Sequence, residues 1–597
     1  MWLRLADRPW LPTSRWAGLT LWTVLLGCAG RTDLRLPSED TDDDDAAAVP
    51  DAGSPLIEQT DKVDVLLVVD NSKNLSAGQD LLARTLPYLL ERLVRPACVN
   101  GLGHVVAETD TPDQPCPIGE RDFPPVRDMH VGVISTSLGG HGADTCGPGS
   151  PTFNPSQNDA AHLLTRTSTG EVVPTYEHQG FLAWDPGQDK VPPGELDLPT
   201  VTQKLEQMVR GAGNVGCGFE SQLESIYRFL VDPEPYLDLS VVGGAAQPTG
   251  TDAVLLAQRA DFLRPDSAVL VVLLTDENDC STREGGQYYL SNQAVLGGVH
   301  YHLPRARAVC ATDPGDACCA SCAESTPAGC VPTASDPGCQ APPLSELDDP
   351  INLRCFDQKR RFGVDFLYPI QRYVRALSEP TVVTRAGDDV ANPLFSGGRS
   401  PKMVFLAGIV GVPWQDIAQE PNALGSGFLP ADQVDWEMVL GEGEGSDPLM
   451  RESVVPRTGT TPRTGDELAP PSATSALANP INGHERDVPA ADDLQYACIY
   501  PLRTPRSCAS DVECECVGDS VSGNPICQQE DGSYAQVQRF ARALPSIRPL
   551  RVIQGLGTQG VVASICAQEV HDEASAAFAY KPAVDAAMRS LRARLSR

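Results

Sequence analysis

The chain has 597 residues, of which 41% are hydrophobic, and a formal net charge of −33 at pH 7. This length suffices for two to four ordinary domains, or for one domain with large insertions. The negative charge argues against a nucleic-acid partner, whose phosphates require clustered Lys and Arg, and against adsorption to anionic lipid. Gly and Pro, at 52 residues each, predict that much of the length is loop and turn.

The N-terminal residues have the order of an export signal. Arg4, Arg8 and Arg15 are followed by the apolar run 16–26 and then by Gly27. A spanning helix needs about twenty apolar residues, so this run is too short to cross a bilayer. The order basic, apolar, small residue predicts a secretory signal peptide.

The end of that run, Leu25-Leu26-Gly27-Cys28, resembles the bacterial lipobox. The resemblance implies a lipoprotein signal peptide over 1–27, cleavage before Cys28 and a diacylglycerol on its thiol. The expected location is therefore the bacterial cell envelope, with the protein held to the membrane by the N-terminal lipid. Because Ala29 is not Asp, the outer membrane is favoured. An ordinary cleaved signal, with Cys28 left free or lost, is the alternative.

The cysteine count fits an exported protein. The chain has nineteen cysteines, and if Cys28 carries the lipid, eighteen remain. Nine disulfides would pair all eighteen. Two stretches, at about 305–356 and 495–530, are dense in cysteine and are expected to be disulfide-rich inserts. Zinc binding by Cys318, Cys319 and Cys322 is the alternative, but irregular spacing in an exported chain favours disulfides.

Two further segments have the composition of flexible chain. Residues 28–60 include the acidic run 42–45 and are predicted to form a disordered tether, since they cannot bury apolar area and repel themselves. Residues 441–485 are rich in Gly, Pro, Ser and Thr and are predicted to be a flexible surface loop. The domain itself is expected over 61–597.

Short apolar runs predict the strands of one sheet. The runs at 63–69 (VDVLLVV), 130–136 (HVGVIST), 268–274 (AVLVVLL) and 403–410 (MVFLAGIV) are typical of strands buried on both faces. Residues 550–553 are assigned as a fifth strand.

Helical spacing of apolar residues separates these runs. It predicts one helix over 81–94, a second that ends near 205–209 and a third over 220–230. Residues 582–597 are predicted to form an amphipathic C-terminal helix. Strands alternating with helices and long polar inserts indicate an α/β fold with an open, mostly parallel sheet.

Carboxylates follow two of these strands. Asp70, Ser72 and Asn74 follow the first strand, while Asp276 and Asp279 follow the third strand. Ligands of open α/β sheets bind beyond the carboxyl ends of the strands, and hard cations such as Mg²⁺ or Ca²⁺ bind oxygen ligands. The sequence therefore predicts a cation site at this edge, with Asp70, Ser72 and Asp276 as its core and Asn74 and Asp279 as helpers.

The arrangement resembles the von Willebrand factor A (vWA) fold and its metal-ion-dependent adhesion site. In that family a DxSxS loop follows the first strand, a TG element precedes a helix, and an Asp follows the fourth strand. Asp70 and Ser72 match the first two positions of the loop, Asn74 stands at its second Ser, and Asp276 matches the later Asp. Cys217 stands at the metal-binding Thr and is expected to form a disulfide, so the site is degenerate.

Other chemistry has weaker signatures. The sequence has no H-E-x-x-H and no G-x-S-x-G, which argues against a zincin and against the commonest serine hydrolases. His300 and His302 could together hold a metal, but a pair without a third ligand is usually structural.

The resemblance implies a non-enzymatic binding or adhesion protein for a protein or glycan ligand. One alternative is an exported hydrolase with its catalytic groups in the inserts or with Asp276 and Asp279 as paired acid and base. The other is a structural envelope lipoprotein whose ion site is inactive.

Overall fold

The computed structural model describes residues 56–597, apart from 102–104, 149, 151, 510–512 and 596–597. The predicted signal peptide, Cys28 and nearly all of the predicted tether lie outside the described residues. Among the described helices, none combines the length and the apolar character that crossing a membrane requires.

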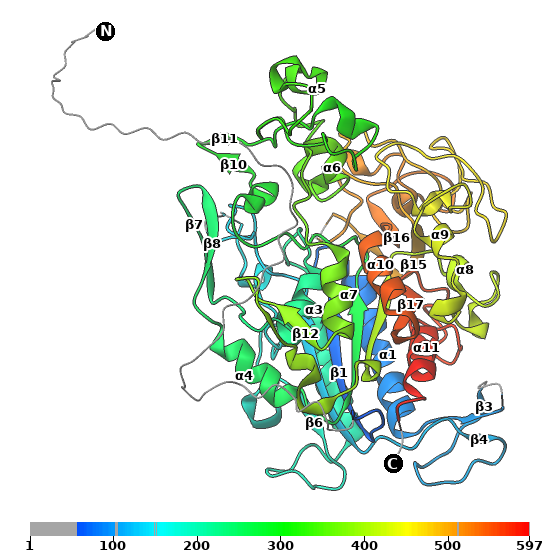
Figure 1. Cartoon of the computed structure of the whole chain (residues 1–597). Helices are drawn as coiled ribbons and strands as arrows, with labels where there is room; N and C mark the ends of the chain where they lie inside the picture. The colour runs from blue at the N-terminus through cyan, green and yellow to red at the C-terminus, as the bar shows by residue number, and fades with distance from the viewer. Residues whose placement is uncertain (1–55, 102–104, 149, 151, 510–512, 596–597) are drawn as a thin grey trace, which may run out of the picture. The chain divides into compact units, whose positions relative to one another are not determined.

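The centre of the fold is a six-stranded sheet with helices on both faces, as predicted for an α/β protein (Figure 1). Its strand order is β17-β14-β9-β1-β5-β6. Neighbouring strands are parallel throughout, except that the edge strand β6 runs antiparallel to β5. The strands are β1 (Lys62–Val69), β5 (Asp128–Ser135), β6 (Leu182–Trp184), β9 (Ala268–Leu274), β14 (Val404–Val410) and β17 (Gly560–Ser564).

Continuous apolar sequence explains the central strands. Every residue of β9 and β14 is buried, and in β1 only Lys62 is partly exposed. Parallel strands covered by helices on both faces need apolar side chains at every position, and β-branched residues suit that environment. The four strands predicted from apolar runs are confirmed, with ends shifted by one or two residues at most.

Two groups of helices cover opposite faces of the sheet. Side chains of α1 and α11 pack with Ala407 and Ile409 of β14, whereas α3, α7 and α10 pack around Leu406. Successive residues of a strand point to opposite faces, so these groups lie on opposite sides. The helices are α1 (Ser76–Val94), α2 (Leu198–Gly211), α3 (Gln222–Leu230), α4 (Ala253–Phe262), α7 (Ile370–Ser378), α10 (Ile547–Leu556) and α11 (Lys581–Leu591).

The assignment of residues 550–553 to a strand is wrong. They lie in α10, where Leu550, Ile553 and Leu556 are buried at helical spacing. The fifth parallel strand is β17, ten residues further along. A short apolar run fits either element, and here the helix buries its apolar face against β14 and β17.

Smaller elements decorate the sheet. They are β2 (Cys98–Val99), β3 (Val105–Ala107), β4 (Glu120–Arg121), β7 (Asp238–Val242), β8 (Ala245–Thr249), β10 (Val295–Leu296), β11 (Val299–His300), β12 (Thr381–Val383), β13 (Asp389–Ala391), β15 (Cys498–Ser507), β16 (Val537–Ala543), α5 (Pro337–Gln340), α6 (Gln358–Phe362), α8 (Trp414–Ile417) and α9 (Trp436–Val439). The pair β15–β16 is an antiparallel hairpin.

Nine disulfides join the eighteen cysteines of the described residues, as the cysteine count predicts. Cys318, Cys319 and Cys322 belong to three different disulfides, which excludes them as a zinc cluster. Cys498 of the hairpin is joined to Cys566, directly beyond β17. The inserts are therefore covalently tied to themselves and to the sheet.

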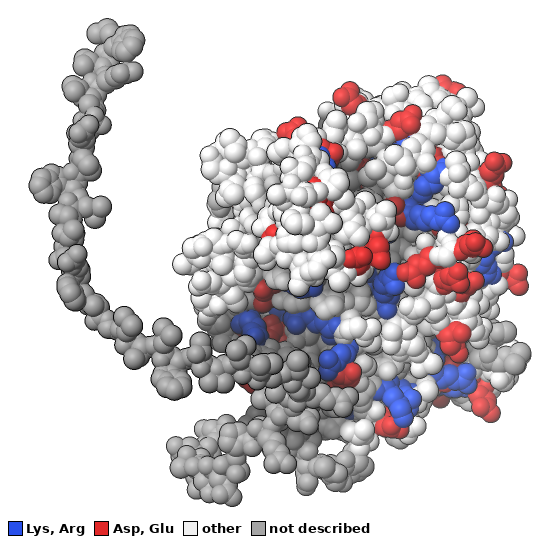
Figure 2. All heavy atoms as spheres, turned by 45° about the horizontal axis from the view of Figure 1, so that its top comes forward, with Lys and Arg blue, Asp and Glu red and all other residues white. Residues whose placement is uncertain are grey.

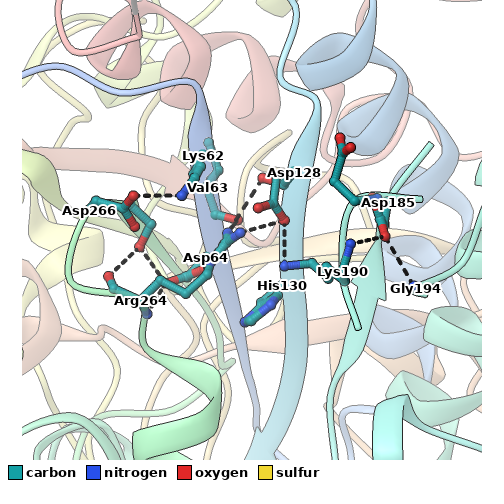
Figure 3. A network of polar contacts seen from close by, with 12 residues as sticks. Lys62, Val63, Asp64, Asp128, His130, Asp185, Lys190, Gly194, Arg264 and Asp266 are labelled. Atoms are coloured by element: carbon teal, nitrogen blue, oxygen red, sulfur yellow. Dashed lines mark hydrogen bonds and ion pairs between the residues drawn. The ribbon is translucent and has the colours of Figure 1, made fainter. Parts of the chain in front are cut away.

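An ion-pair network closes the amino edge of the sheet (Figure 3). Asp64 of β1 is fully buried and pairs with Arg264 at 2.6 Å, and Arg264 also pairs with Asp128 of β5. Lys190 pairs with Asp128 at 3.0 Å. Ionised carboxylates are stable in the interior when they are paired with a cation, so this network holds the loop after α4 against the starts of β1 and β5.

Candidate functional site

Two loops leave the carboxyl edge of the sheet side by side. Val69 of β1 is paired with Leu274 of β9, and the Asp70 amide donates a hydrogen bond of 3.0 Å to the Leu274 carbonyl. Asp70 and Asp276 therefore follow neighbouring strands at the same edge, as expected for parallel strands. We call Asp70, Ser72 and Asp276, with the residues that contact them, the rim site.

Asp70 is fully buried and held in one orientation. One carboxylate oxygen, Oδ1, accepts a hydrogen bond of 2.8 Å from the Ser72 amide, and Oδ2 accepts one of 2.7 Å from the Thr275 hydroxyl. Burial outweighs these hydrogen bonds and raises the pKa of Asp70 to about 6. The Asp70–Thr275 bond joins the two loops directly.

Two buried oxygen atoms of the rim site have no hydrogen-bond partner. They are Oγ of Ser72, which is 6% exposed, and Oδ1 of Asp276, which is 1% exposed. Burial raises the pKa of Asp276 well above its usual range, and the charges of Glu277 and Asp70 add to this effect. Unsatisfied buried oxygen atoms are rare in proteins and call for a physical explanation such as an ion.

Glu220 is a further carboxylate of the rim site that sequence reasoning missed. It lies between Cys217 and α3 and is only 3% exposed. Burial raises the pKa of Glu220 well above its usual range, and so do the charges of Glu277, Asp70 and Asp276. Its place just after the expected TG element is the one signal in the sequence that could have identified it.

Arg542 of β16 supplies positive charge to the rim site. Its guanidinium forms ion pairs with Glu277 at 2.9 Å, Glu515 at 3.1 Å and Asp276 at 3.5 Å. Leu544, just beyond β16, donates its amide to the Asp276 carbonyl at 2.7 Å. The hairpin therefore covers the carboxyl edge, and no sequence pattern could have predicted a contact across 265 residues.

The remaining predicted residues have other contacts. Asp279 accepts a hydrogen bond of 3.0 Å from the Leu223 amide in the first turn of α3, and it pairs with Arg548 at 3.0 Å. Its carboxylate thus joins α3 to α10. Asn74 lies half-buried in the turn before α1. Cys217 forms the expected disulfide, with Cys146 as its partner.

His300 and His302 contact different carboxylates. The exposed His300 lies 3.5 Å from Glu346, whereas His302 lies 3.4 Å from the buried Asp349. Each imidazole thus has a local acidic partner of its own, which fits the structural alternative for this pair.

The donor set of the rim site suits a hard cation better than a transition metal. Over the part of the chain that the structure describes, no three His, Cys, Asp or Glu side chains are placed to hold one metal ion. Mg²⁺, however, is commonly bound by one or two carboxylates together with hydroxyls and waters. Asp70 and Asp276, with the unpartnered hydroxyl of Ser72, provide such a set.

The rim site differs in its charge from the surrounding surface. On the face drawn in Figure 2, acidic side chains are interspersed with Lys and Arg. At the rim site, by contrast, the carboxyl groups of Asp70, Glu220 and Asp276 are buried, and Arg542 forms an ion pair with Asp276. Comparison of the chain with protein families, with curated proteins and with solved structures finds no match.

Proposed function

We propose that the chain is an exported, lipid-anchored binding protein of the bacterial cell envelope, built on a vWA-like domain and without enzymatic activity. Three observations support the vWA-like assignment: the open, mostly parallel sheet, Asp70 and Ser72 directly after the central strand β1, and Asp276 directly after β9. The nine disulfides support export, because such bonds form in oxidising compartments.

The proposal includes a divalent cation, Mg²⁺ or Ca²⁺, at the rim site. Asp70, Ser72 and Asp276 would hold it, and the observation that carries this step is the pair of unpartnered buried oxygen atoms, Ser72 Oγ and Asp276 Oδ1. When bound, the cation would offer positive charge to an acidic group of a protein or glycan ligand. Asn74 is a candidate helper, whereas Asp279 is already used between α3 and α10.

The partly exposed side of the rim site is where a ligand would approach. The side chains of Glu277 and Glu515 are 24% and 17% exposed, while Asp70 and Asp276 beneath them are buried. The disulfide-tied inserts frame this edge, and loops on a rigid scaffold commonly determine binding specificity.

Calorimetric titration of the full chain with Mg²⁺, Ca²⁺ and Mn²⁺ tests the proposal. We expect one cation per chain at the rim site, with an affinity that falls at least about tenfold in Asp276→Asn, since a carboxylate ligand is lost. Asp266→Asn is the matched control, because Asp266 pairs with Lys62 at the opposite edge of the sheet. Absence of binding up to millimolar cation, or unchanged binding in Asp70→Ala, would refute the cation mechanism.

The second candidate is a structural envelope lipoprotein with an inactive ion site. The specific observation in its favour is Arg542, whose guanidinium already neutralises part of the acidic charge. The same titration separates the two functions, because with an inactive rim site Asp276→Asn leaves the titration unchanged.

A further inference from the structure

A second group of buried carboxylates lies outside the rim site. Asp416 belongs to α8, which follows β14, and Asp447 precedes the short 3-10 turn Pro448–Met450 in the 441–485 segment. Both residues are 0% exposed. Although its composition predicts a flexible surface loop, this segment therefore places a carboxylate in the interior.

Three of the four carboxylate oxygens have no hydrogen-bond donor. Asp447 Oδ1 accepts a bond of 2.6 Å from the Leu449 amide, while Asp447 Oδ2 and both oxygens of Asp416 have no partner. The two carboxyl groups are within hydrogen-bonding reach of each other. The structure thus brings two fully buried carboxyl groups together, and a backbone amide donates to one of their four oxygens.

The surrounding charged groups leave the pair without a direct counter-ion. Arg463 donates to the backbone carbonyl of Asp416 at 3.2 Å rather than to its carboxylate. Arg457 is bound to the buried Glu485 at 2.8 and 3.0 Å.

Two more charged side chains lie close by. Asp435, at the start of α9, adds negative charge on the Asp416 side, and Arg451 adds positive charge on the Asp447 side. The guanidinium of Arg451 hydrogen-bonds to the Ser446 hydroxyl. Neither side chain supplies a donor to the three unpartnered oxygens.

Buried carboxylates in this arrangement need a cation or a shared proton. The ligand atoms available here are the carboxylate oxygens of Asp416 and Asp447, three of which have no hydrogen-bond partner. Oxygen donors select hard cations, and Mg²⁺ keeps several waters whereas Ca²⁺ readily accepts carboxylate, amide and backbone oxygens. A fully buried pair leaves little room for waters and therefore favours Ca²⁺.

We propose that Asp416 and Asp447 bind one calcium ion, which ties α8 to the 441–485 segment. Neither carboxylate belongs to the rim site, so this proposal stands independently of the proposed function.

Terbium luminescence of the full chain provides a direct test. Tb³⁺ replaces Ca²⁺ at oxygen sites, and Trp414, two residues before Asp416 on α8, is a nearby sensitiser. We expect tryptophan-excited Tb³⁺ emission that Ca²⁺ abolishes by competition, and its loss in Asp416→Asn and in Asp447→Asn. Trp414→Phe should weaken the emission but keep the binding of Ca²⁺ measured by calorimetry.

Controls assign the signal to this site. Asp276→Asn removes a rim carboxylate and should leave the emission unchanged, as should Asp435→Asn, which alters an exposed neighbour. Thermal unfolding adds a second readout. At a calcium concentration 100 times the dissociation constant of this site, binding there should raise the ratio of folded to unfolded protein about 100-fold. Asp447→Asn should lose this gain and keep only what calcium at the rim site contributes.

Two outcomes would overturn the proposal. One is a wild-type chain that shows neither sensitised emission nor a calcium-dependent unfolding midpoint, which would mean that the pair shares a proton. The other is a calcium response that survives in both Asp416→Asn and Asp447→Asn but disappears in Asp276→Asn, which would assign the ion to the rim site alone.

Discussion

Replacing Arg542 by Met tests whether the rim site is held together by charge. The guanidinium is 5% exposed and pairs with Asp276, Glu277 and Glu515. Removing one partner of a buried ion pair costs about 3–5 kcal/mol, because the remaining charges stay in a poorly solvated place. Glu277 and Glu515 are partly exposed and can regain water, whereas Asp276, with a side-chain exposure of 2%, cannot. We therefore expect a loss near the lower end of that range.

Guanidinium chloride unfolding of Arg542→Met and of Arg539→Met measures the effect. Arg539 lies on the same strand, but its partner Glu530 is 84% exposed, so its pair is expected to contribute under about 1 kcal/mol. If both variants lose the same free energy of unfolding, the guanidinium of Arg542 does not stabilise the rim site, and our reading of its ion pairs is wrong.

The loss in Arg542→Met should also grow with pH. Burial raises the pKa of Asp276 well above the ordinary value of 3.8, and Arg542 lowers it again. An acid whose folded pKa is raised loses stability as the pH rises above its unfolded pKa. Without Arg542 the folded pKa rises further, so the gap between variant and wild type should widen as the pH is raised from about 4.

Two further predictions concern the same edge. Burial raises the pKa of Asp70 to about 6, so ionisation of Asp70 should lower the free energy of unfolding by roughly 3 kcal/mol as the pH rises from about 4 to about 6. In cation-free urea unfolding, Asp70→Asn should flatten this dependence of the unfolding free energy on pH. An unchanged pH dependence would contradict the prediction. Replacing both Cys146 and Cys217 by Ser opens a loop of 71 residues and should lower the free energy of unfolding by about 4 kcal/mol, measured by thermal unfolding. The same change at Cys508 and Cys514, which close a loop of 6 residues, should lower it by about 2 kcal/mol. Equal losses would argue against a chain-entropy origin of the stabilisation.

Much of the central layer follows from local pattern. The four apolar runs became β1, β5, β9 and β14, because residues buried on both faces of a parallel sheet must be apolar at every position. Edge elements were harder to predict. The three residues of β6 are too few for a clear period. Residues 550–553 of α10 resemble a strand because a run so short, with three apolar residues, fits both structures.

The rim site was predictable only in part. Asp70 and Asp276 follow strands, and neighbouring parallel strands end at one edge, so their proximity could be expected from order alone. Asp279 stands three residues further and was expected to help, yet its carboxylate accepts the Leu223 amide and pairs with Arg548. The side chain of a loop residue three positions from a predicted ligand can point away from the site, and the spacing in the sequence does not reveal its direction.

The amino-acid sequence by itself determined the four central strands, the parity of the cysteines and the two acidic loops, because these depend on neighbours within a few residues. Only the tertiary structure decided which cysteines are joined, that Arg542 contacts Asp276, and that Asp416 faces Asp447. Such contacts join segments whose separation along the chain carries no periodic signal. These contacts form because the inserts pack onto the sheet. Burial of apolar side chains determines where each insert lies, and charged side chains that are buried there form ion pairs with one another.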